Sequence, residues 1–460
     1  MLLINDNCFC EVHVIIRYPW TLTCRRHIAA LLFTVAAGAV SPVPRLSAQI
    51  LSSTERLIAA YVDAHTEDAV ALLEQVVNIN SGTMNFTGVQ EVGQVFRQEL
   101  DALGFATRWV DGEPFERAGH LVAEHTGSEP HILLIGHLDT VFEEDSPFQQ
   151  FELLPDSAAR GPGVIDMKGG GVVMVLALQA LQAAGVLDEL RVTVIMMGDE
   201  EESGDPLQLA RSELMAAAEP ADIAIGFEDG DGDPRTAVIA RRGFTGWELR
   251  VSGRPAHSSL IFRGDIGAGA IYETARILNS FYELLAGEQY LTFNPGMIVG
   301  GTTVGFDAMQ NRGTAFGKTN VIAESTVVAG DLRTLSPEQR EDAKRRMRVI
   351  VRQHRPQTAA EITFEDTYPP MAPTDGNRRL LAMFDQASRD LGYGPVEPVD
   401  PGAAGAADIS FTADHVEMAL DGLGLMGDGG HTVNETADLR TLPMQAKRAA
   451  VLIYRLTERE

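Results

Sequence analysis

Apolar residues alternate along the chain between two spacings, and they predict strands separated by helices. Residues 131–136 (HILLIG), 191–197 (RVTVIMM) and 222–227 (DIAIGF) are short apolar runs, typical of buried strands. Apolar residues at helical spacing predict helices over 89–103, 169–186 and 206–218. Strands that alternate with helices are typical of βαβ units. We therefore predict an α/β domain around a mostly parallel sheet.

The pattern changes near Gly243. Beyond it we expect strands over 245–252, 291–304, 319–331 and 361–365, with helices over 266–286 and 337–354. This βαββαβ order suits a small sheet with two helices on one face. After about residue 370 the α/β pattern returns and ends in a helix near 442–456. We therefore predict a small α+β domain inserted into a larger one, with the larger domain over 49–242 and 368–460 and the insertion over 243–367.

Length and charge limit the possible functions. A chain of 460 residues is too long for one ordinary core, so two domains are expected. Its formal net charge of −27 argues against binding to nucleic acid or to an anionic membrane, because phosphate contacts need a basic surface. The acidic balance does not identify a substrate.

The first residues of the chain have the layout of a secretory signal. Arg25 and Arg26 precede an apolar run over 28–40, and residues 46–48 (LSA) are similar to a signal-peptidase site. We predict that residues 1–48 are a signal peptide and that the protein is periplasmic or secreted. An uncleaved membrane anchor is the alternative. The apolar run is short for a membrane span, so we expect no stable membrane insertion after the signal is removed.

Polar clusters follow the predicted strands, where open parallel sheets place their ligand sites. In the first cluster, GHLDT, His137 could bind a metal, and Asp139 on the same face of the strand could orient its imidazole. In the second, GPGVIDMKGG, Asp166 precedes a helix. The ordinary alternatives are a strand-end His and Asp, and an Asp that caps a helix.

Three further polar features follow the same rule. Residues 199–202 are four consecutive acids after a buried strand, where like charges must be neutralised by protons, cations or a metal unless the loop is exposed. Glu228 follows the strand over 222–227. The cluster GDGGHTVNE contains His431 among glycines that let the backbone approach a ligand closely. A surface loop histidine is the alternative for His431.

The ligand types point to a particular metal centre. All three cysteines lie within residues 1–48, so a metal in the rest of the chain must be held by histidines and carboxylates. Two histidines and at least three carboxylates, all after strands, suit a pair of zinc ions bridged by one carboxylate. Such a pair can polarise a carbonyl group and activate water.

Seven motifs together resemble a known family. GHLDT, GVIDMKGGG, GDEEE, GFED, GRPAHSS, DLRT and GDGGHTVNE occur in the order and rough spacing of the dizinc metallopeptidase family of glutamate carboxypeptidase, aminoacylase and succinyl-diaminopimelate desuccinylase. The resemblance extends from about residue 55 to 458. It implies an α/β zinc-peptidase catalytic domain, an inserted lid and dimerisation domain, and a homodimer formed through that lid.

The resemblance also implies which residues bind the metals. His137 and Glu228 would bind one zinc, Glu201 and His431 would bind the other, and Asp166 would bridge the two. Co²⁺ or Mn²⁺ are possible substitutes for zinc. The peptide bond after Asp166 is often cis in such proteins.

Catalytic residues follow from the same resemblance. Glu200 would be the general base, Asp139 would orient the first histidine ligand, and His257 would reach the partner subunit's site to stabilise the oxyanion. Arg333 and Asn320 would bind the terminal carboxylate of the substrate. A core or surface histidine, and a surface ion pair of the arginine with its neighbouring aspartate, are the alternatives.

One departure from the family pattern leaves two alignments open. Relatives often have one residue between DEE and Gly-Ser, whereas here Gly204 comes one residue later. Anchoring on the strand makes Glu200 the base and Glu201 the ligand, and anchoring on the glycine shifts both roles by one residue, to Glu201 and Glu202. We prefer the strand anchor, because a strand fixes where its side chains point and a loop can absorb an insertion.

These observations predict a zinc-dependent hydrolase that cleaves an amide or peptide bond next to a free carboxylate, as a carboxypeptidase or an N-acyl-amino-acid amidohydrolase. The expected partner is a small peptide or acyl-amino acid. One alternative is a catalytically inactive exported binding or scaffold protein of the same fold. Another is a deacylase or phosphoesterase with one metal, which would leave one of the two histidines without a role.

Overall fold

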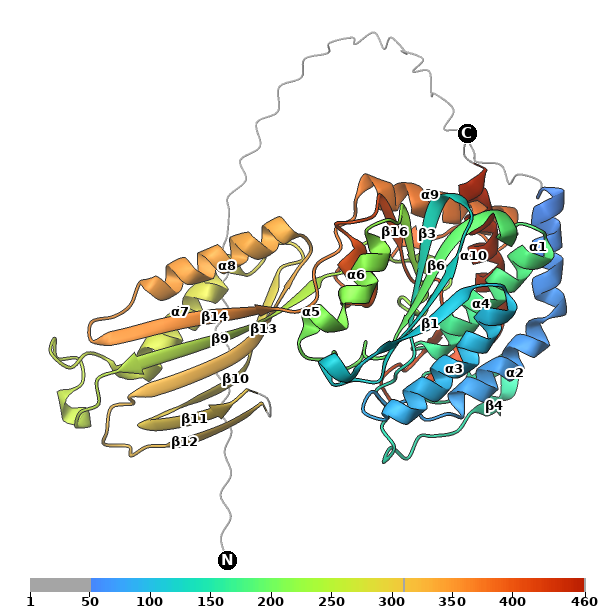
Figure 1. Cartoon of the computed structure of the whole chain (residues 1–460). Helices are drawn as coiled ribbons and strands as arrows, with labels where there is room; N and C mark the ends of the chain where they lie inside the picture. Colours follow the sequence, from blue (N-terminus) through green and yellow to red (C-terminus); the bar gives the residue numbers. More distant parts are fainter. Residues whose placement is uncertain (1–50, 309–310, 459–460) are drawn as a thin grey trace, which may run out of the picture. The chain divides into compact units, whose positions relative to one another are not determined.

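The computed structural model describes residues 51–308 and 311–458, and the predicted signal peptide lies outside these residues. In this part of the chain we find no helix with the length and apolar character that a membrane span needs. The described residues form two main sheets (Figure 1).

The larger sheet has six strands in the order β1-β2-β6-β3-β7-β16. Strands β6, β3, β7 and β16 run parallel to one another, and β1 and β2 complete one edge in antiparallel pairing. The mostly parallel sheet predicted from the sequence is therefore confirmed. The strands are β1 (Ala106–Asp111), β2 (Gly119–His125), β3 (Ser128–His137), β6 (Leu190–Met197), β7 (Ile223–Gly226) and β16 (Met418–Leu420).

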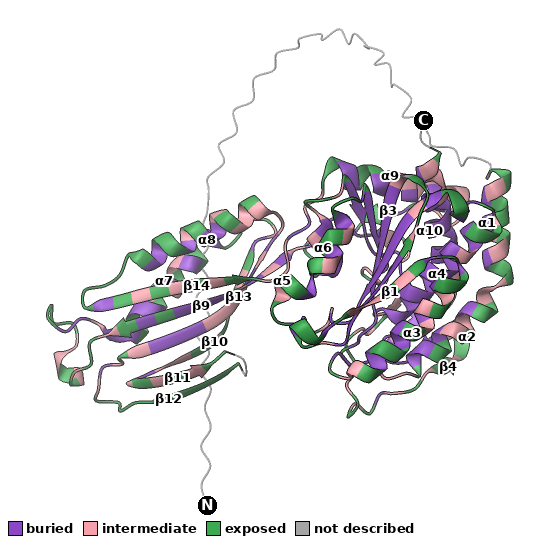
Figure 2. Cartoon of the chain, in the orientation of Figure 1, coloured by how far each residue is buried: buried purple, intermediate pink, exposed green. Residues whose placement is uncertain are grey.

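Helices cover both faces of this sheet. One face packs against six helices in one continuous apolar core, and the other packs mainly against α6 and a short 3-10 helix, η5. The interior strands are buried along most of their length (Figure 2). These helices are α1 (Ser53–Ala64), α2 (Thr66–Val77), α3 (Phe86–Ala102), α4 (Lys168–Ala183), α9 (Asp375–Asp390) and α10 (Thr441–Thr457) on the first face, with α6 (Ser212–Ala218) and η5 (Asp408–Thr412) on the second.

The smaller sheet is antiparallel, with four strands in the order β10-β13-β9-β14. Alternate residues of β9 are buried against α7 and α8, so both helices cover one face of the sheet and the other face stays open (Figure 1). Its elements are β9 (Gly243–Gly253), α7 (Gly269–Leu285), β10 (Thr292–Gly301), β13 (Ser325–Thr334), α8 (Pro337–Arg352) and β14 (Thr358–Asp366).

The order of elements in the smaller sheet matches the predicted βαββαβ pattern, with one addition. The strand expected over 291–304 is interrupted at Thr302, and the chain then forms the hairpin of β11 (Thr303–Asp307) and β12 (Arg312–Phe316). The strand expected over 319–331 begins only at Ser325. The hairpin was not predicted because its residues are mostly exposed, so they carry little of the alternation of buried and exposed positions that indicates a strand. The function of the inserted segment as a lid stays a prediction.

Short elements complete the described chain. They are β4 (Glu152–Leu154), β5 (Ala158–Arg160), β17 (Gly427–Asp428) and β18 (Thr436–Asp438) in one small sheet, β8 (Thr236–Ala237) with β15 (Glu397–Pro398) in another, helix α5 (Leu207–Ala210), and the 3-10 helices η1 (Glu113–Phe115), η2 (Pro155–Ser157), η3 (Leu187–Glu189) and η4 (Ser258–Leu260).

Candidate metal centre

Three neighbouring parallel strands bring three of the predicted site segments to one end of the larger sheet. His137 is the last residue of β3, the acidic run 199–202 follows β6, and Glu228 follows β7. Because β3 lies between β6 and β7, their carboxyl ends meet at the same edge. The strand order alone therefore accounts for the convergence of segments that are far apart in the sequence.

Asp166 lies between two imidazoles, with one carboxylate oxygen near each. Its Oδ1 atom is 3.1 Å from Nε2 of His137, and its Oδ2 atom is 2.9 Å from Nε2 of His431. Asp166 comes just before α4, and its peptide bond to Met167 is cis, as the resemblance implies. A carboxylate in this position could bridge two cations, each bound by one of the imidazoles.

Each imidazole also has a carboxylate of its own. Glu228 places Oε1 3.6 Å from Nε2 of His137, and Glu201 places Oε2 3.1 Å from Nε2 of His431. Ligand atoms of His137, Asp166 and Glu201 all lie within 4.8 Å of one another, close enough to hold a metal ion. The Oε1 atom of Glu201 is buried, and no group in the described part of the chain forms a hydrogen bond with it.

The donor atoms of the five residues suit divalent cations. Nitrogen and carboxylate oxygen are the donors that zinc prefers, and a buried oxygen without a hydrogen-bond partner is a vacant ligand atom. The set divides into one histidine and one glutamate on each side of a shared aspartate, which matches two cations more closely than one.

Burial and mutual charge strongly shift the ionisation of these groups. Burial acts to lower the pKa of His137, but the carboxylates of Glu228, Asp139 and Asp166 outweigh it and raise the pKa well above the ordinary value. Hydrogen bonds to Asp166 and Glu201 raise the pKa of His431 to about 11. Cations that enter such a site take the place of protons on the histidines.

Asp139 holds the first histidine and the acidic loop together. Its backbone carbonyl lies 3.0 Å from Nδ1 of His137, and its carboxylate lies 3.5 Å from the same nitrogen. The carboxylate also accepts hydrogen bonds from the backbone N–H groups of Glu200 and Glu201, both at 3.1 Å, and from the hydroxyl of Thr83 at 2.6 Å. Asp139 therefore positions two neighbouring segments at once.

Glu200 is half-buried beside this cluster. Burial raises the pKa of its carboxyl well above the ordinary value, and the neighbouring Asp408 raises it further. A raised pKa makes a carboxylate a stronger proton acceptor, which is a property that a general base needs.

The acidic run is neutralised by two arginines that the sequence analysis did not identify. Arg211 is fully buried and lies 2.6 Å from Asp199 and 2.8 Å from Asp408. At the surface, Arg117 pairs with Glu202 at 3.1 Å. The side chain beside His431 is that of Glu201 and not that of Glu202, and the choice between the two alignments of base and ligand stays a prediction. Arg211 was missed because a continuous helix was predicted over 206–218, whereas the chain breaks between α5 and α6 at this residue.

Glu435 fixes the loop that carries the bridging aspartate. Its buried carboxylate accepts hydrogen bonds from the backbone N–H groups of Gly163, Ile165 and Asp166, at 3.0, 2.9 and 3.2 Å. The motif GDGGHTVNE therefore contributes His431, which contacts Asp166, and Glu435, which holds the loop that carries Asp166.

The remaining predicted residues lie in the segment that forms the smaller sheet. The backbone carbonyl of Asn320 accepts a hydrogen bond from Ser258, the residue after the exposed His257. Arg333 pairs with Asp331 at 3.2 Å and lies over the ring of Phe244, so the ion pair considered as its alternative is present. Within the described residues, none of the three predicted side chains forms a hydrogen bond or ion pair with the cluster.

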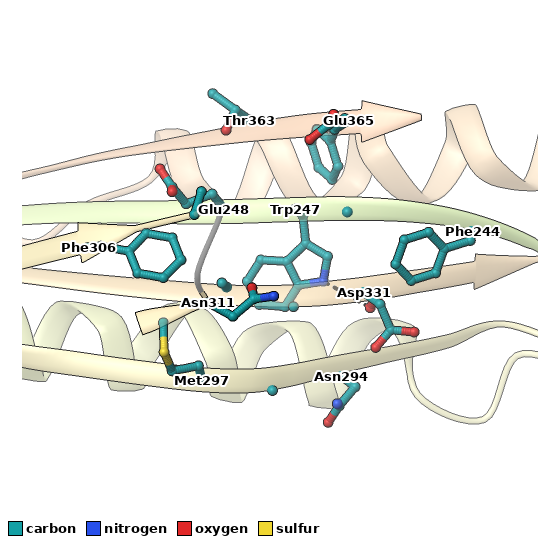
Figure 3. A pocket seen from close by; sticks show the side chains of 16 residues that line it. Phe244, Trp247, Glu248, Asn294, Met297, Phe306, Asn311, Asp331, Thr363 and Glu365 are labelled. Carbon is teal, nitrogen blue, oxygen red and sulfur yellow. Dashed lines mark hydrogen bonds between the residues drawn. The ribbon is translucent and has the colours of Figure 1, made fainter. Parts of the chain in front are cut away.

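A separate pocket lies on the open face of the smaller sheet (Figure 3). It has a volume of about 760 Å³, and aromatic and acidic side chains line it, including Phe306, Glu248 and Asp331. It contains none of the five candidate ligands, so the pocket and the histidine–carboxylate cluster are distinct sites.

Comparison with known proteins places this geometry in a family. Residues 133–455 match peptidase family M20/M25/M40. The chain is 23% identical to carboxypeptidase G2 of Pseudomonas sp. (strain RS-16) over 84% of this chain and 89% of that protein. It is 26% identical to succinyl-diaminopimelate desuccinylase of Acidiphilium cryptum (strain JF-5) over 84% of this chain and 96% of that protein.

A solved structure shares the fold. YXEP of Bacillus subtilis, described as a dinuclear metal binding peptidase from the M20 family, is similar with a TM-score of 0.59 and 16% identity, over 86% of this chain and 99% of that chain. With the family match over most of the chain and a group of residues able to hold a metal, the conclusion is that this chain belongs to peptidase family M20/M25/M40.

Proposed function

We propose that the chain is a dizinc hydrolase of amide or peptide bonds next to a free carboxylate. His137 and Glu228 would hold one cation, Glu201 and His431 would hold the other, and Asp166 would bridge them. The observation that supports this most is the placement of the two Asp166 oxygens, each within 3.1 Å of a different imidazole that has its own glutamate. Zinc suits these donors, with Co²⁺ or Mn²⁺ as substitutes.

The residues around the cluster would carry the proton transfers. When bound, the two cations would supply polarisation of the scissile carbonyl and activation of a water molecule. Glu200 would accept a proton from that water and later donate it to the leaving amine, a sequence that its raised pKa favours. Asp139 would keep His137 oriented through the contacts at Nδ1.

The smaller-sheet segment would supply substrate contacts. His257 would stabilise the oxyanion in the partner subunit's site, and Arg333 with Asn320 would bind the substrate carboxylate through the forked donors of the guanidinium group. In this proposal Arg333 exchanges its present partner, Asp331, for the substrate. The expected substrates are small peptides or acyl-amino acids, in a homodimer formed through this segment.

We also propose that the protein is exported, with residues 1–48 as its signal peptide. Mass spectrometry of the protein recovered from the periplasm or the medium would give the mature N-terminus. A mature chain that starts near residue 49 is the expected result, and a full-length chain in the membrane fraction would support the anchor alternative.

The decisive experiment combines metal analysis with a substrate screen. Purified protein should contain about two equivalents of zinc or cobalt per chain and should hydrolyse some members of a set of dipeptides and acyl-amino acids. One equivalent would favour a mononuclear enzyme. Absence of stoichiometric metal together with absence of turnover would favour the inactive scaffold and would refute the proposed function.

A further inference from the structure

The position of Glu200 is set by its backbone. Its N–H donates a hydrogen bond to Asp139 at 3.1 Å, and its carbonyl accepts one from the hydroxyl of Tyr368 at 3.0 Å. Among residues 51–308 and 311–458, no hydrogen bond reaches the carboxylate of Glu200 itself. The two backbone contacts therefore fix the point on the main chain from which this side chain extends.

Tyr368 stands where the chain crosses between the two sheets. It follows the end of β14 by two residues, and its own carbonyl accepts a hydrogen bond from the N–H of Phe244, at the start of β9, at 2.9 Å. The smaller sheet begins with β9 at Gly243 and ends with β14 at Asp366, so the residues before Phe244 and around Tyr368 are the two connections into and out of this sheet. Tyr368 thus joins the two connections of the smaller sheet, through its hydrogen bond with Phe244, to the backbone of Glu200.

Arg211 fixes the direction in which the Tyr368 hydroxyl points. A guanidinium N–H of Arg211 donates to the hydroxyl oxygen at 2.8 Å, and Ser203 lies 3.2 Å from the same oxygen. Arginine can only donate and a carbonyl can only accept, so the Tyr368 hydroxyl accepts from Arg211 and donates its single proton to the carbonyl of Glu200. Ser203 then acts as a second donor to the hydroxyl.

The arginine is itself immobilised. Two aspartates, Asp199 and Asp408, flank it at 2.6 and 2.8 Å, and it is fully buried. The rings of Tyr368 and Phe411 each lie 5.6 Å from the guanidinium carbon. Hydrogen bonds in such a buried, charged chain strengthen one another, so the hydroxyl is held firmly.

We propose that Tyr368 is a positioning residue that places Glu200 for proton transfer and couples that placement to the crossover from the smaller sheet. This inference rests on the proposed role of Glu200 as the base. The hydrogen bonds of its hydroxyl go to Glu200, Ser203 and Arg211, none of which is a candidate ligand, so it acts through the backbone of Glu200. Loss of its hydroxyl should affect the catalytic step more than substrate binding.

The test compares two tyrosine-to-phenylalanine variants in the metal-loaded, full-length protein. Tyr368→Phe removes the hydroxyl and keeps the ring. Tyr393→Phe is a matched control, because the Tyr393 hydroxyl also accepts from a cation, Lys447 at 3.2 Å, and its ring also lies beneath an arginine, Arg448 at 5.4 Å. Steady-state kinetics, metal content, thermal midpoint and backbone hydrogen exchange of residues 199–204 are measured for both.

We expect Tyr368→Phe to lower kcat by about 10- to 100-fold with KM changed by less than about threefold, since small misplacements of a reacting group have effects of this size. Metal content should stay at the wild-type level, and residues 199–204 should exchange faster. The control should change none of these, although both variants should lose similar thermal stability.

Three results would overturn the inference. They are an unchanged kcat in Tyr368→Phe, equal losses of kcat in both variants, and unchanged hydrogen exchange of residues 199–204. The exchange measurement does not depend on turnover, so it remains decisive if the wild-type protein proves inactive. In that case the proposed function fails on the wild-type assay, while the positioning contact is judged separately by exchange.

Discussion

The buried ion pair beneath Glu228 provides a direct test of how this site is supported. Asp421 is fully buried and accepts hydrogen bonds from Arg241 at 2.9 Å and from the backbone N–H of Glu228 at 3.3 Å. Arg241 is also buried, and the attraction of Asp421 raises its pKa despite the opposing effect of burial. We consider the isosteric variant Asp421→Asn, which removes the charge and little volume.

The structure gives the size of the expected effect. In the variant, the side-chain oxygen of the new asparagine would accept from the N–H of Glu228, and its NH₂ group would then face the guanidinium group of Arg241. The buried arginine would lose the negative charge of Asp421 and would face a donor in place of an acceptor. Breaking a buried pair by removing one partner typically costs about 3–5 kcal/mol of unfolding free energy. An exposed pair of the same type is worth about 0–1 kcal/mol.

A matched surface pair supplies the control. The distance from Nη2 of the arginine to Oδ2 of the aspartate is 2.7 Å in the pair Asp438–Arg440 and 2.8 Å in the pair Asp421–Arg241. The side chains of Asp438 and Arg440, however, are 35% and 71% exposed. Urea unfolding of metal-free protein would compare Asp421→Asn with Asp438→Asn at equal ionic strength. A difference between the two variants of less than about 1 kcal/mol would refute the argument that burial makes the first pair indispensable.

Four further results are expected. Glu200→Ala should keep its metal content but lose several orders of magnitude in kcat, because it removes the carboxylate proposed to take the proton from water. A rate near wild type, in an assay with metal content checked, would refute the base assignment. Binding of Zn²⁺ should release a proton from His431, because its pKa, raised to about 11, keeps the imidazole protonated until the metal displaces the proton, and the affinity for Zn²⁺ should therefore increase as the pH rises through neutrality. Calorimetry in buffers of different ionisation enthalpy would detect this release, and binding independent of pH would contradict it. Arg333→Ala should mainly reduce kcat/KM for substrates with a free carboxylate, and an equal loss on carboxyl-blocked substrates would argue against the clamp. Gly170→Ala should lower unfolding free energy by about 1–3 kcal/mol or more, since its Cβ would lie 1.9 Å from the carbonyl oxygen of Phe227, whereas Gly264→Ala, which meets no atom within 4 Å, should be tolerated in the same urea assay.

The sequence alone was sufficient for the central architecture. Apolar runs over 131–136, 191–197 and 222–227 predicted three strands of the larger sheet, and the helix expected over 169–186 is α4. The rule that ligand sites follow parallel strands then placed His137 and Glu228 at one edge. These predictions succeeded because strand identity and side-chain alternation depend on local periodicity, which a sequence displays directly.

The supports of the site could not be inferred from the sequence in the same way. Arg211 sits in a segment with helical spacing, and nothing nearby indicates that it neutralises Asp199 and Asp408, the latter almost two hundred positions away. Tyr368 follows β14 in an unremarkable stretch of chain, yet it bonds to Glu200. Such contacts join segments distant in sequence, and a single sequence contains no record of which distant residues meet.

Sequence therefore determined the element types, the order of strands and helices, and the residues with suitable donor atoms. Tertiary structure decided which of those donors converge, with Asp166 between His137 and His431, and which charges are balanced by Arg211 and Arg241. The physical reason is one of range: backbone conformation responds to neighbouring residues, whereas ionisation and ligand geometry depend on burial and on charges within a few ångströms, which only the folded chain brings together.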